Sequence, residues 1–216
     1  MNIQAVYAAV SPYFRRRRMR RFLREMQPGP ETTILDVGGS KSTWEYTEGL
    51  TGRITILNLL PPSDAERADK RYDFVVGDAT ALPYPDKSFD VVFSNSVIEH
   101  VGDFDKQTAF ACEAVRVGRA IWVQTPAKEF FVEPHLIAPF FHWLPTRWQH
   151  DIAPRFTLWG LMTKPTAKQV AAFLATIRLL SAREFRALFP GATIVVERLL
   201  GMPKSYIAVC SSTAAE

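Results

Sequence analysis

TILDVGGSKS, residues 33–42, is the most informative turn in the chain. Its apolar run reaches Asp36 and then Gly38 and Gly39, an order typical of the turn between a strand and a helix at a nucleotide site. A dinucleotide fingerprint would have a third glycine, which this stretch lacks. The stretch therefore predicts a strand, a tight turn and a helix beside a ligand, and the rest of the chain must identify that ligand.

Short β-like runs alternate with helical patterns, which is the rhythm of a parallel sheet covered on both faces. A crossover helix is predicted over 105–117, ending at Gly118, and the capping box that begins at Ser181 predicts another helix. The pattern indicates an α/β fold with a doubly wound, mostly parallel seven-stranded sheet and helices on both faces. The predicted strands are 33–36, 53–58, 72–76, 90–94, 120–124, 193–199 and 206–210.

The composition is that of one soluble globular domain. The 216 residues are 47% hydrophobic and 22% charged, so we predict a single domain over 1–216. Within it we expect a basic helical segment over 1–30 and a cap inserted over 125–165. Cys112 and Cys210 lack paired spacing, which argues against a disulfide framework or a zinc site and favours a cytoplasmic location. Neither export nor a membrane span is expected, because no leader pattern or apolar run of bilayer length is present.

The strongest signal is residues 77–101, GDATALPYPDKSFDVVFSNSVIEHV. With ILDVGGS before them, and TPAKEFFVEPHLIAPFFHWLP and LLSAREFRALFPGA after them, they resemble class I S-adenosylmethionine (SAM)-dependent methyltransferases. The resemblance covers most of the chain from about Thr33 onward. It implies a Rossmann-like fold, SAM as the cofactor and methyl transfer as the activity.

The resemblance also implies roles for single residues. Asp36 matches the acidic residue that ends the first strand, and Asn58 falls where the family usually has an acidic residue that binds the ribose hydroxyls. Asp78 matches the carboxylate that accepts from the adenine amino group. Asn95 and Ser96 match the segment at the methionine end. The implied cofactor-binding set is Asp36, Gly38, Gly39, Ser40, Asn58, Leu59, Gly77, Asp78, Ala79, Asn95 and Ser96.

Three positions depart from the family pattern. Ser40 and Ser42 replace the second and third glycines, and a capping box that starts at Ser42 predicts that the helix begins there. SAM has no phosphate, so the turn needs fewer glycines. Asn58 offers an amide in place of a carboxylate, without charge-assisted strength. These departures motivate an alternative function, a catalytically degenerate member acting as a binding or scaffold protein, while a nicotinamide oxidoreductase is opposed by the missing glycine.

Two histidines are candidate catalytic residues. A hydroxyl acceptor must lose a proton, and an imidazole titrates near neutrality. His100 follows the fourth predicted strand and His135 follows the fifth, so both are predicted as candidate bases. The alternatives are that Glu99 and His100 form the solvated side of a helical turn and that His135 lies on the surface or in a lid. No metal site is predicted.

The segment after the fifth strand is dense in aromatic residues and prolines, which indicates a folded cap. Half or more of its rings are expected in a satellite core, and the rest could line an acceptor pocket. We therefore predict methyl transfer to a small-molecule, saccharide or lipid-linked acceptor, at a hydroxyl oxygen. The oligomeric state is left open.

The basic run from Arg15 to Arg21 is interpreted as the solvated face of a helix that starts at Ser11-Pro12. The buried stripe of that helix would hold Tyr13, Met19, Phe22, Leu23 and Met26. The alternative is weak contact with an anionic membrane surface. Nucleic acid is not expected as a partner, because the chain lacks the stacked-aromatic basic pattern of single-strand binders.

Overall fold

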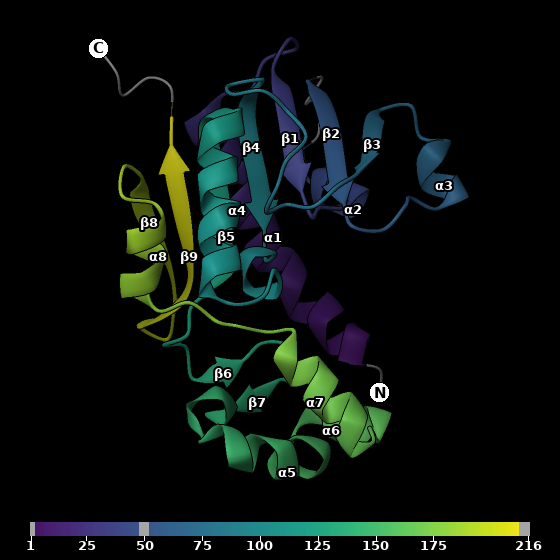
Figure 1. Cartoon of the computed structure of the whole chain (residues 1–216), viewed down its shortest axis with the longest axis vertical. Helices are drawn as coiled ribbons and strands as arrows, with labels where there is room; N and C mark the ends of the chain where they lie inside the picture. Colours follow the sequence, from purple (N-terminus) through teal and green to yellow (C-terminus); the bar gives the residue numbers. More distant parts are fainter. Residues whose placement is uncertain (1–2, 48–51, 212–216) are drawn as a thin grey trace.

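The computed structural model describes residues 3–47 and 52–211, with side chains from residue 13 onward. Its main sheet has seven strands in the order β3-β2-β1-β4-β5-β9-β8 (Figure 1). Strands β1 to β5 pair in parallel, and β9 runs antiparallel to both of its neighbours, β5 and β8. The strands are β1 (Thr33–Val37), β2 (Arg53–Asn58), β3 (Tyr72–Val76), β4 (Phe89–Asn95), β5 (Gly118–Pro126), β8 (Thr193–Leu199) and β9 (Met202–Cys210).

Helices α4 (Phe104–Val117) and α8 (Ala182–Leu188) cover one face of this sheet. Helix α4 begins at the N-cap Asp103, whose side chain accepts from the backbone N–H of Lys106, and it ends where Gly118 turns the chain into β5. The predicted crossover helix and the predicted capping box at Ser181 are thereby confirmed.

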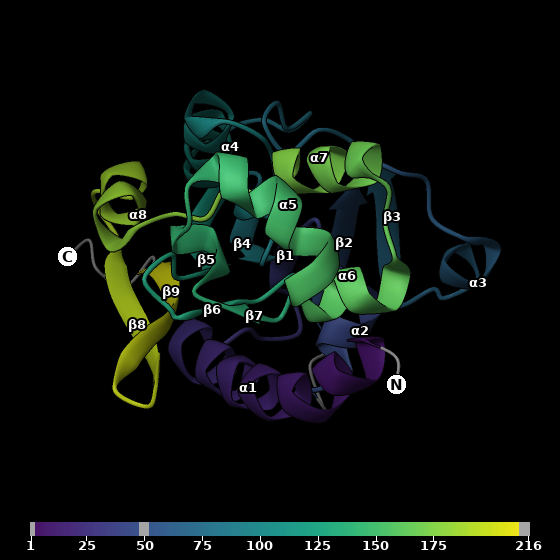
Figure 2. The same cartoon turned by 90° about the horizontal axis from the view of Figure 1, so that it is seen from below.

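The other face is covered by α1 (Ile3–Met26) and the short α2 (Lys41–Trp44), on the opposite side of the strands from α4 and α8 (Figure 2). Phe22 of α1 is fully buried and its ring meets Trp122 edge-on, with centroids 5.6 Å apart. This core on each face confirms a doubly wound sheet. Because β1 lies between β2 and β4, the chain reverses its direction of winding there, and ligands of such sheets bind beyond the carboxyl ends of those strands.

The chain between β5 and α8 builds a cap beyond those carboxyl ends (Figure 1). It has a core of its own, formed by Leu136, Ala138, Phe141, Ala153 and Val170. Its elements are β6 (Val132–Glu133), β7 (Ala138–Pro139), η2 (Phe141–Trp143), α5 (Thr146–Phe156), α6 (Leu158–Thr163) and α7 (Ala167–Ala175).

The rings of the cap divide between its interior and its surface. Phe130 and Phe141 are buried, and Trp159 stacks on Phe173 with ring centroids 4.6 Å apart. Four large rings remain exposed, namely Phe140, Trp143, Trp148 and Phe156. Only some of the aromatic rings of the cap therefore pack in its interior.

Two predicted helix starts are wrong. Helix α1 begins before Ser11-Pro12, because Pro12 lies inside it and not at its first turn. Helix α2 has Ser40 as its N-cap, with extended backbone angles, and the predicted cap Ser42 lies within the helix. The two serine hydroxyls contact each other at 2.8 Å, so neither forms the predicted capping box.

Candidate functional site

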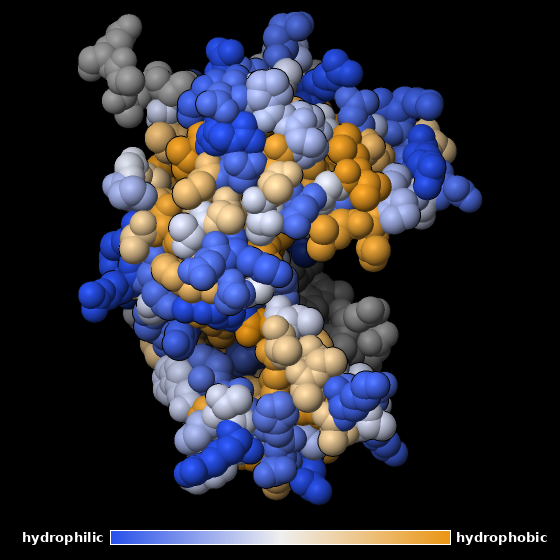
Figure 3. Space-filling view, viewed as in Figure 1, coloured by the Kyte–Doolittle hydropathy of each residue, from blue (hydrophilic) through white to orange (hydrophobic). Residues whose placement is uncertain are grey.

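Two adjoining cavities lie at the carboxyl ends of β1, β2 and β4. One has a volume of about 440 Å³ and reaches under the cap, and the other, of about 570 Å³, extends along β2 and β3. Both are lined by Gly38 and Ser96, so they meet where the chain leaves β1 and β4. Figure 3 shows the hollow between the sheet and the cap, rimmed by apolar residues on its sheet side. We call them the cap cavity and the strand cavity.

The turn after β1 is tightly packed. Gly38 has φ of +72°, which favours glycine, and its N–H donates to the carbonyl oxygen of Leu57 at 2.7 Å. A Cβ on Gly39 would lie 1.8 Å from Oδ2 of Asp36. The glycine pair thus brings the backbone against Leu57 of β2 and against the Asp36 carboxylate.

Asp36 stands behind this turn and lines neither cavity. It is fully buried, and its Oδ2 accepts from Nε1 of Trp44 at 2.7 Å. Its Oδ1 has no hydrogen-bond partner among the residues that the structure describes. Burial raises the pKa of Asp36 to about 7, against the opposing effect of the Trp44 hydrogen bond. Asp36 therefore supports the turn from the inside.

Asn58 lines the strand cavity at the end of β2, together with Leu59. Its Nδ2 donates to the carbonyl oxygen of Gly39 at 3.0 Å, so its amide ties β2 to the turn after β1. Its Oδ1 is left as the atom that can accept from a ligand. A carboxylate could not make the same bond to the Gly39 carbonyl.

Gly77, Asp78 and Ala79 line the far end of the strand cavity. Oδ1 of Asp78 accepts from the backbone N–H and from the hydroxyl of Thr80, both at 2.8 Å, and these bonds hold its pKa below the ordinary value. Oδ2 takes part in neither bond. One oxygen of Asp78 thus forms the turn, while the other is available to a donor in the cavity.

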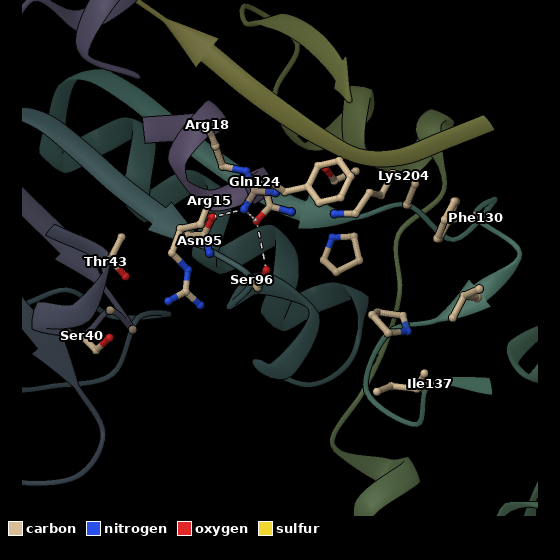
Figure 4. Close-up of a pocket in the computed structure, with 18 residues that line it drawn as sticks. Arg15, Arg18, Ser40, Thr43, Asn95, Ser96, Gln124, Phe130, Ile137 and Lys204 are labelled. Atoms are coloured by element: carbon tan, nitrogen blue, oxygen red, sulfur yellow. Dashed lines mark hydrogen bonds between the residues drawn. The ribbon is translucent and has the colours of Figure 1, made fainter. Parts of the chain in front are cut away.

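Beyond β4, Asn95 and Ser96 line the cap cavity as predicted, and Ser96 also lines the strand cavity. Ser96 has φ of +58°, an uncommon conformation for a residue with a side chain, and both of its donors are used by Gln124 of β5. Its N–H donates to the backbone oxygen and its hydroxyl to Oε1 of Gln124, each at 3.0 Å (Figure 4). Gln124 thereby fixes the junction of the two cavities.

Arg18 completes this polar wall from α1. Its guanidinium donates to Gln124 Oε1 at 3.0 Å and to the side chain of Asn95 (Figure 4). It also forms an ion pair with Glu197 at 2.6 Å. Arg18 is only 7% exposed. The interpretation of the whole basic run as a solvated face is therefore wrong at Arg18. Ser205 also donates to Glu197, so the anion is shared between α1 and β9.

Two further cations line the cap cavity. Arg15 forms no ion pair with the side chains that the structure describes, and Figure 4 shows its guanidinium on the side of Ser40 and Thr43. Lys204 lies on the opposite side with Phe130, and its ammonium stands 4.1 Å from the ring centroid of Phe14. Burial, followed by repulsion from Arg18, lowers the pKa of Lys204 to about 8.

His100 and His135 lie together, with ring centroids 4.7 Å apart and the planes at 84°. His100 ends the 3₁₀ turn η1 (Ile98–His100) and lines the strand cavity, whereas His135 lies in the cap between β6 and β7 and lines neither of the two cavities. Burial and the adjacent His135 lower the pKa of His100. Burial acts in the same direction on His135, but the hydrogen bond and charge of Glu133 outweigh it and raise its pKa.

Glu99, between these histidines and the sheet, is fully buried, so its interpretation as a solvated residue is wrong. Oε2 accepts from the Thr125 hydroxyl at 2.9 Å, and burial raises the pKa of Glu99 to about 7. The three groups meet although they come from η1 and from the cap.

All of the predicted cofactor-binding residues except Asp36 thus line one or both of the two cavities. The predicted site set lacks Arg18, Gln124 and Lys204, which line the cap cavity. Gln124 ends a strand that was predicted, and its place beside the serine that follows β4 was the available signal. No comparable signal marks Arg18, which lies in a run of like residues.

No helix in the described ranges is long and apolar enough to cross a bilayer.

Residues 35–120 match the family model described as "Methyltransferase domain", which is less than half of the chain. The 2-methyl-6-phytyl-1,4-hydroquinone methyltransferase of Synechocystis sp. is 40% identical over 100 residues, covering 41% of this chain and 29% of that protein. The chain therefore spans less than a third of the length of that curated relative.

Solved structures share the fold at low sequence identity. A SAM-dependent methyltransferase from Aquifex aeolicus has a TM-score of 0.50 and 13% identity, with 88% of each chain covered. A protein from Rhodobacter sphaeroides titled as a putative Zn-dependent alcohol dehydrogenase has a TM-score of 0.59 and 16% identity, with 88% and 87% covered. The chain therefore has the Rossmann-like fold of class I SAM-dependent methyltransferases, and its residues 35–120 match the methyltransferase-domain family model.

Proposed function

We propose that the protein transfers a methyl group from SAM to a small-molecule acceptor held under the cap. The observation that supports this most directly is the meeting of two cavities at Gly38 and Ser96, one lined by Asp78 and the other by the cap. A long cofactor can extend through the strand cavity and present one end to the cap cavity. The hydroquinone methyltransferase similarity supports a small-molecule acceptor.

The residues present fit SAM. Asp78 Oδ2 would accept from the adenine amino group, and Asn58 Oδ1 would accept from a ribose hydroxyl. Arg15 is placed to receive the methionine carboxylate, because it lies with Ser40 and Thr43 beside the turn after β1. Asn95 and Ser96 would contact the methionine end. When bound, SAM supplies an electrophilic methyl group.

The task of the chain is then to align the acceptor with that methyl group and to keep water out. Phe130, Val132 and Ile137 give the cap cavity an apolar wall, and Lys204 adds one cation to it. An acceptor with a flat or apolar body and a polar or anionic group matches this lining. We therefore propose that the acceptor is a small molecule, a saccharide or a lipid-linked compound of this kind.

We propose a hydroxyl oxygen as the methylated atom and the pair His100 and His135 as the groups that activate it. The pair lies within the same side-chain cluster as Glu99, and His100 lines a cavity that meets the acceptor side. Glu133 holds Nδ1 of His135 at 2.7 Å, which fixes the ring. An acceptor that is already a nucleophile would need no such activation.

The test is calorimetric titration with S-adenosylhomocysteine. Asp78→Asn keeps an oxygen for Thr80 but replaces Oδ2 with an NH₂ group, which meets the adenine amino donor. The expected loss is about 1–3 kcal/mol of binding free energy, or roughly 5- to 150-fold in Kd. Asp73→Asn is the matched control, because Asp73 is exposed on β3 and pairs with Arg53 outside both cavities.

Equal affinities of Asp78→Asn and Asp73→Asn for S-adenosylhomocysteine would show that Asp78 does not bind the cofactor. Failure of the unmodified protein to bind would remove the cofactor role altogether. Tight binding without turnover on any acceptor would favour the degenerate binding or scaffold protein. We also propose a cytoplasmic location, supported by two cysteines that are both free, Cys112 and Cys210.

A further inference from the structure

Three side chains that can bind a metal ion meet where the cap touches the sheet. One potential ligand atom each from Glu99, His100 and His135 lies within 4.8 Å of the other two. Glu99 is fully buried, and its Oε1 finds no hydrogen-bond partner in the part of the chain that the structure describes. A buried carboxylate oxygen without a partner requires an explanation, and an ion is one of the few that satisfy it.

The hydrogen bonds of the two rings orient them as ligands. Nδ1 of His100 lies 3.2 Å from the carbonyl oxygen of Thr176, which can only accept, so Nδ1 holds the proton. Nδ1 of His135 lies 2.7 Å from Oε1 of Glu133, whose other oxygen accepts from the N–H of Leu136. Each neutral ring therefore keeps its lone pair on Nε2. Metal-binding histidines typically donate their other N–H to a carbonyl or a carboxylate in this way.

Glu99 is held by the same kind of support. Its Oε2 accepts from the hydroxyl of Thr125 at 2.9 Å, which leaves Oε1 for the ion. Its backbone oxygen accepts from the N–H of Arg178 at 2.8 Å, and Gln107 donates to the adjoining carbonyl of Ile98. All three candidate ligands thus have a second polar atom fixed by a neighbour, as in a site built before the ion arrives.

We propose that Glu99, His100 and His135 bind a divalent transition-metal ion, with Zn²⁺ the best match. Two imidazoles and one carboxylate form a donor set typical of zinc sites that keep an open position. Mg²⁺ is disfavoured, because it prefers an octahedral set of oxygen ligands. Binding of the ion does not depend on the proposed function. Only the activation of an acceptor at the open position of the ion rests on it.

Binding would join the cap to the sheet. His135 comes from the cap, whereas Glu99 and His100 follow β4. Ligand atoms around a tetrahedral zinc ion are about 3.3 Å apart, given Zn–N distances of about 2.0–2.1 Å. The candidate ligand atoms lie within 4.8 Å of one another, so binding would need only a small approach of His135 to Glu99 and His100.

An ion held by these three residues would lie beside the strand cavity, because His100 lines it. A water or an acceptor hydroxyl bound there would have a lowered pKa and release its proton to bulk water. The histidine pair would then activate the acceptor by holding the ion and not by taking the proton itself.

The experiment is titration of the chelator-treated, desalted full chain with ZnCl₂ by calorimetry, in the absence of SAM. We expect one equivalent to bind, with Glu99→Gln and His100→Ala each weakening the affinity at least tenfold. His150→Ala, which removes an exposed histidine of α5, is the matched control and should leave the affinity unchanged. MgCl₂ should not compete, and Co²⁺ should give the visible absorption of a nitrogen-containing site of low coordination number.

The same samples are titrated with S-adenosylhomocysteine. Zinc binding that fails while S-adenosylhomocysteine binds would overturn the metal site and leave the proposed function standing, with the histidine pair as a proton acceptor. Zinc binding that is equal in His100→Ala and weakened in His150→Ala would show an adventitious site and would also overturn it. Because His100 is exposed, we expect His100→Ala to fold. That variant therefore tests zinc binding even if Glu99→Gln does not fold.

Discussion

Nδ2 of Asn58 donates to the carbonyl oxygen of Gly39 across 3.0 Å, so the end of β2 holds the turn that follows β1. The resemblance to methyltransferases placed this side chain on the ribose alone, where a carboxylate would serve as well or better. In the structure the amide nitrogen is used by Gly39 and the amide oxygen is left for a ligand. Only a neutral amide can donate to one neighbour and accept from another.

Asn58→Asp should therefore weaken S-adenosylhomocysteine binding, because a carboxylate beside the Gly39 carbonyl repels it. We expect a loss of about 1–3 kcal/mol, measured by calorimetry. Asn58→Ala removes the bond without adding a charge and should lose less. Stronger binding by the aspartate variant would show that the ribose contact dominates.

Gly39→Ala should disrupt the same turn from the other side. Its Cβ would lie 1.8 Å from the carboxylate of Asp36, which is buried and cannot move away freely. We expect a clear fall in the melting temperature and loss of the shift caused by S-adenosylhomocysteine. Gly191→Ala is the matched control, because its Cβ would meet nothing within 4 Å. Comparable melting temperatures for the two variants would contradict the packing described.

Asp36→Asn should change how stability depends on pH. Burial raises the pKa of folded Asp36 to about 7, whereas an aspartate in the unfolded chain has its ordinary pKa of 3.8. Between these values the unfolded chain binds fewer protons, so this residue makes the free energy of unfolding fall as pH rises. The asparagine cannot ionise and can still accept from Trp44.

Chemical denaturation at about pH 5 and about pH 8 measures this difference, since the two values bracket most of the titration. The variant should lose less stability across the interval than the unmodified protein. Asp73→Asn, exposed on β3, should retain the original slope. An unchanged slope for Asp36→Asn would mean that the carboxyl group is already ionised in the fold.

Arg18→Gln should destabilise the protein strongly, because it leaves Glu197 partly buried without its cation. Breaking a buried ion pair typically costs about 3–5 kcal/mol, and adding Glu197→Gln should recover part of that loss. Arg17→Gln with Arg20→Gln is the control, since both residues are exposed. Urea unfolding measures the free energy of unfolding of each variant. Equal losses in Arg18→Gln and in the control variant would contradict the contacts assigned to Arg18.

The same exposed pair tests the membrane alternative for the basic run. Sedimentation with vesicles of anionic lipid should show little binding if this face is only solvated. Salt-sensitive binding that disappears in the double variant would instead establish contact with an anionic surface.

The sheet was predictable because each strand is a short apolar run and each crossover has the period of a helix. The predicted ranges 53–58, 72–76 and 193–199 agree with β2, β3 and β8 residue for residue. Helix α7 was missed although Thr166 and Gln169 form a capping box, because the surrounding segment was interpreted only by its aromatic content. The predicted start of α2 was wrong because Ser42 and Glu45 have the spacing of a capping box, whereas the structure uses Ser40 as the N-cap.

The polar interior was predictable only in part. Charged side chains are usually exposed, so Arg18 was assigned to solvent and a solvated Glu99 was kept as an alternative. Their burial depends on partners in other elements, Glu197 in β8 for the first and Thr125 in β5 for the second. Patterns within one element contain no information about such partners. The site residues that were found lie directly after strands, where the topology itself brings them together.

The ion pair between Arg18 and Glu197 joins residues 179 positions apart in the sequence. Because synthesis runs from the N-terminus, the arginine is made well before its anion. This ion pair therefore cannot form until β8 has been synthesised. The parallel half of the sheet can assemble earlier from nearer contacts, so Arg18 would meet Asn95 and Gln124 before it meets its anion.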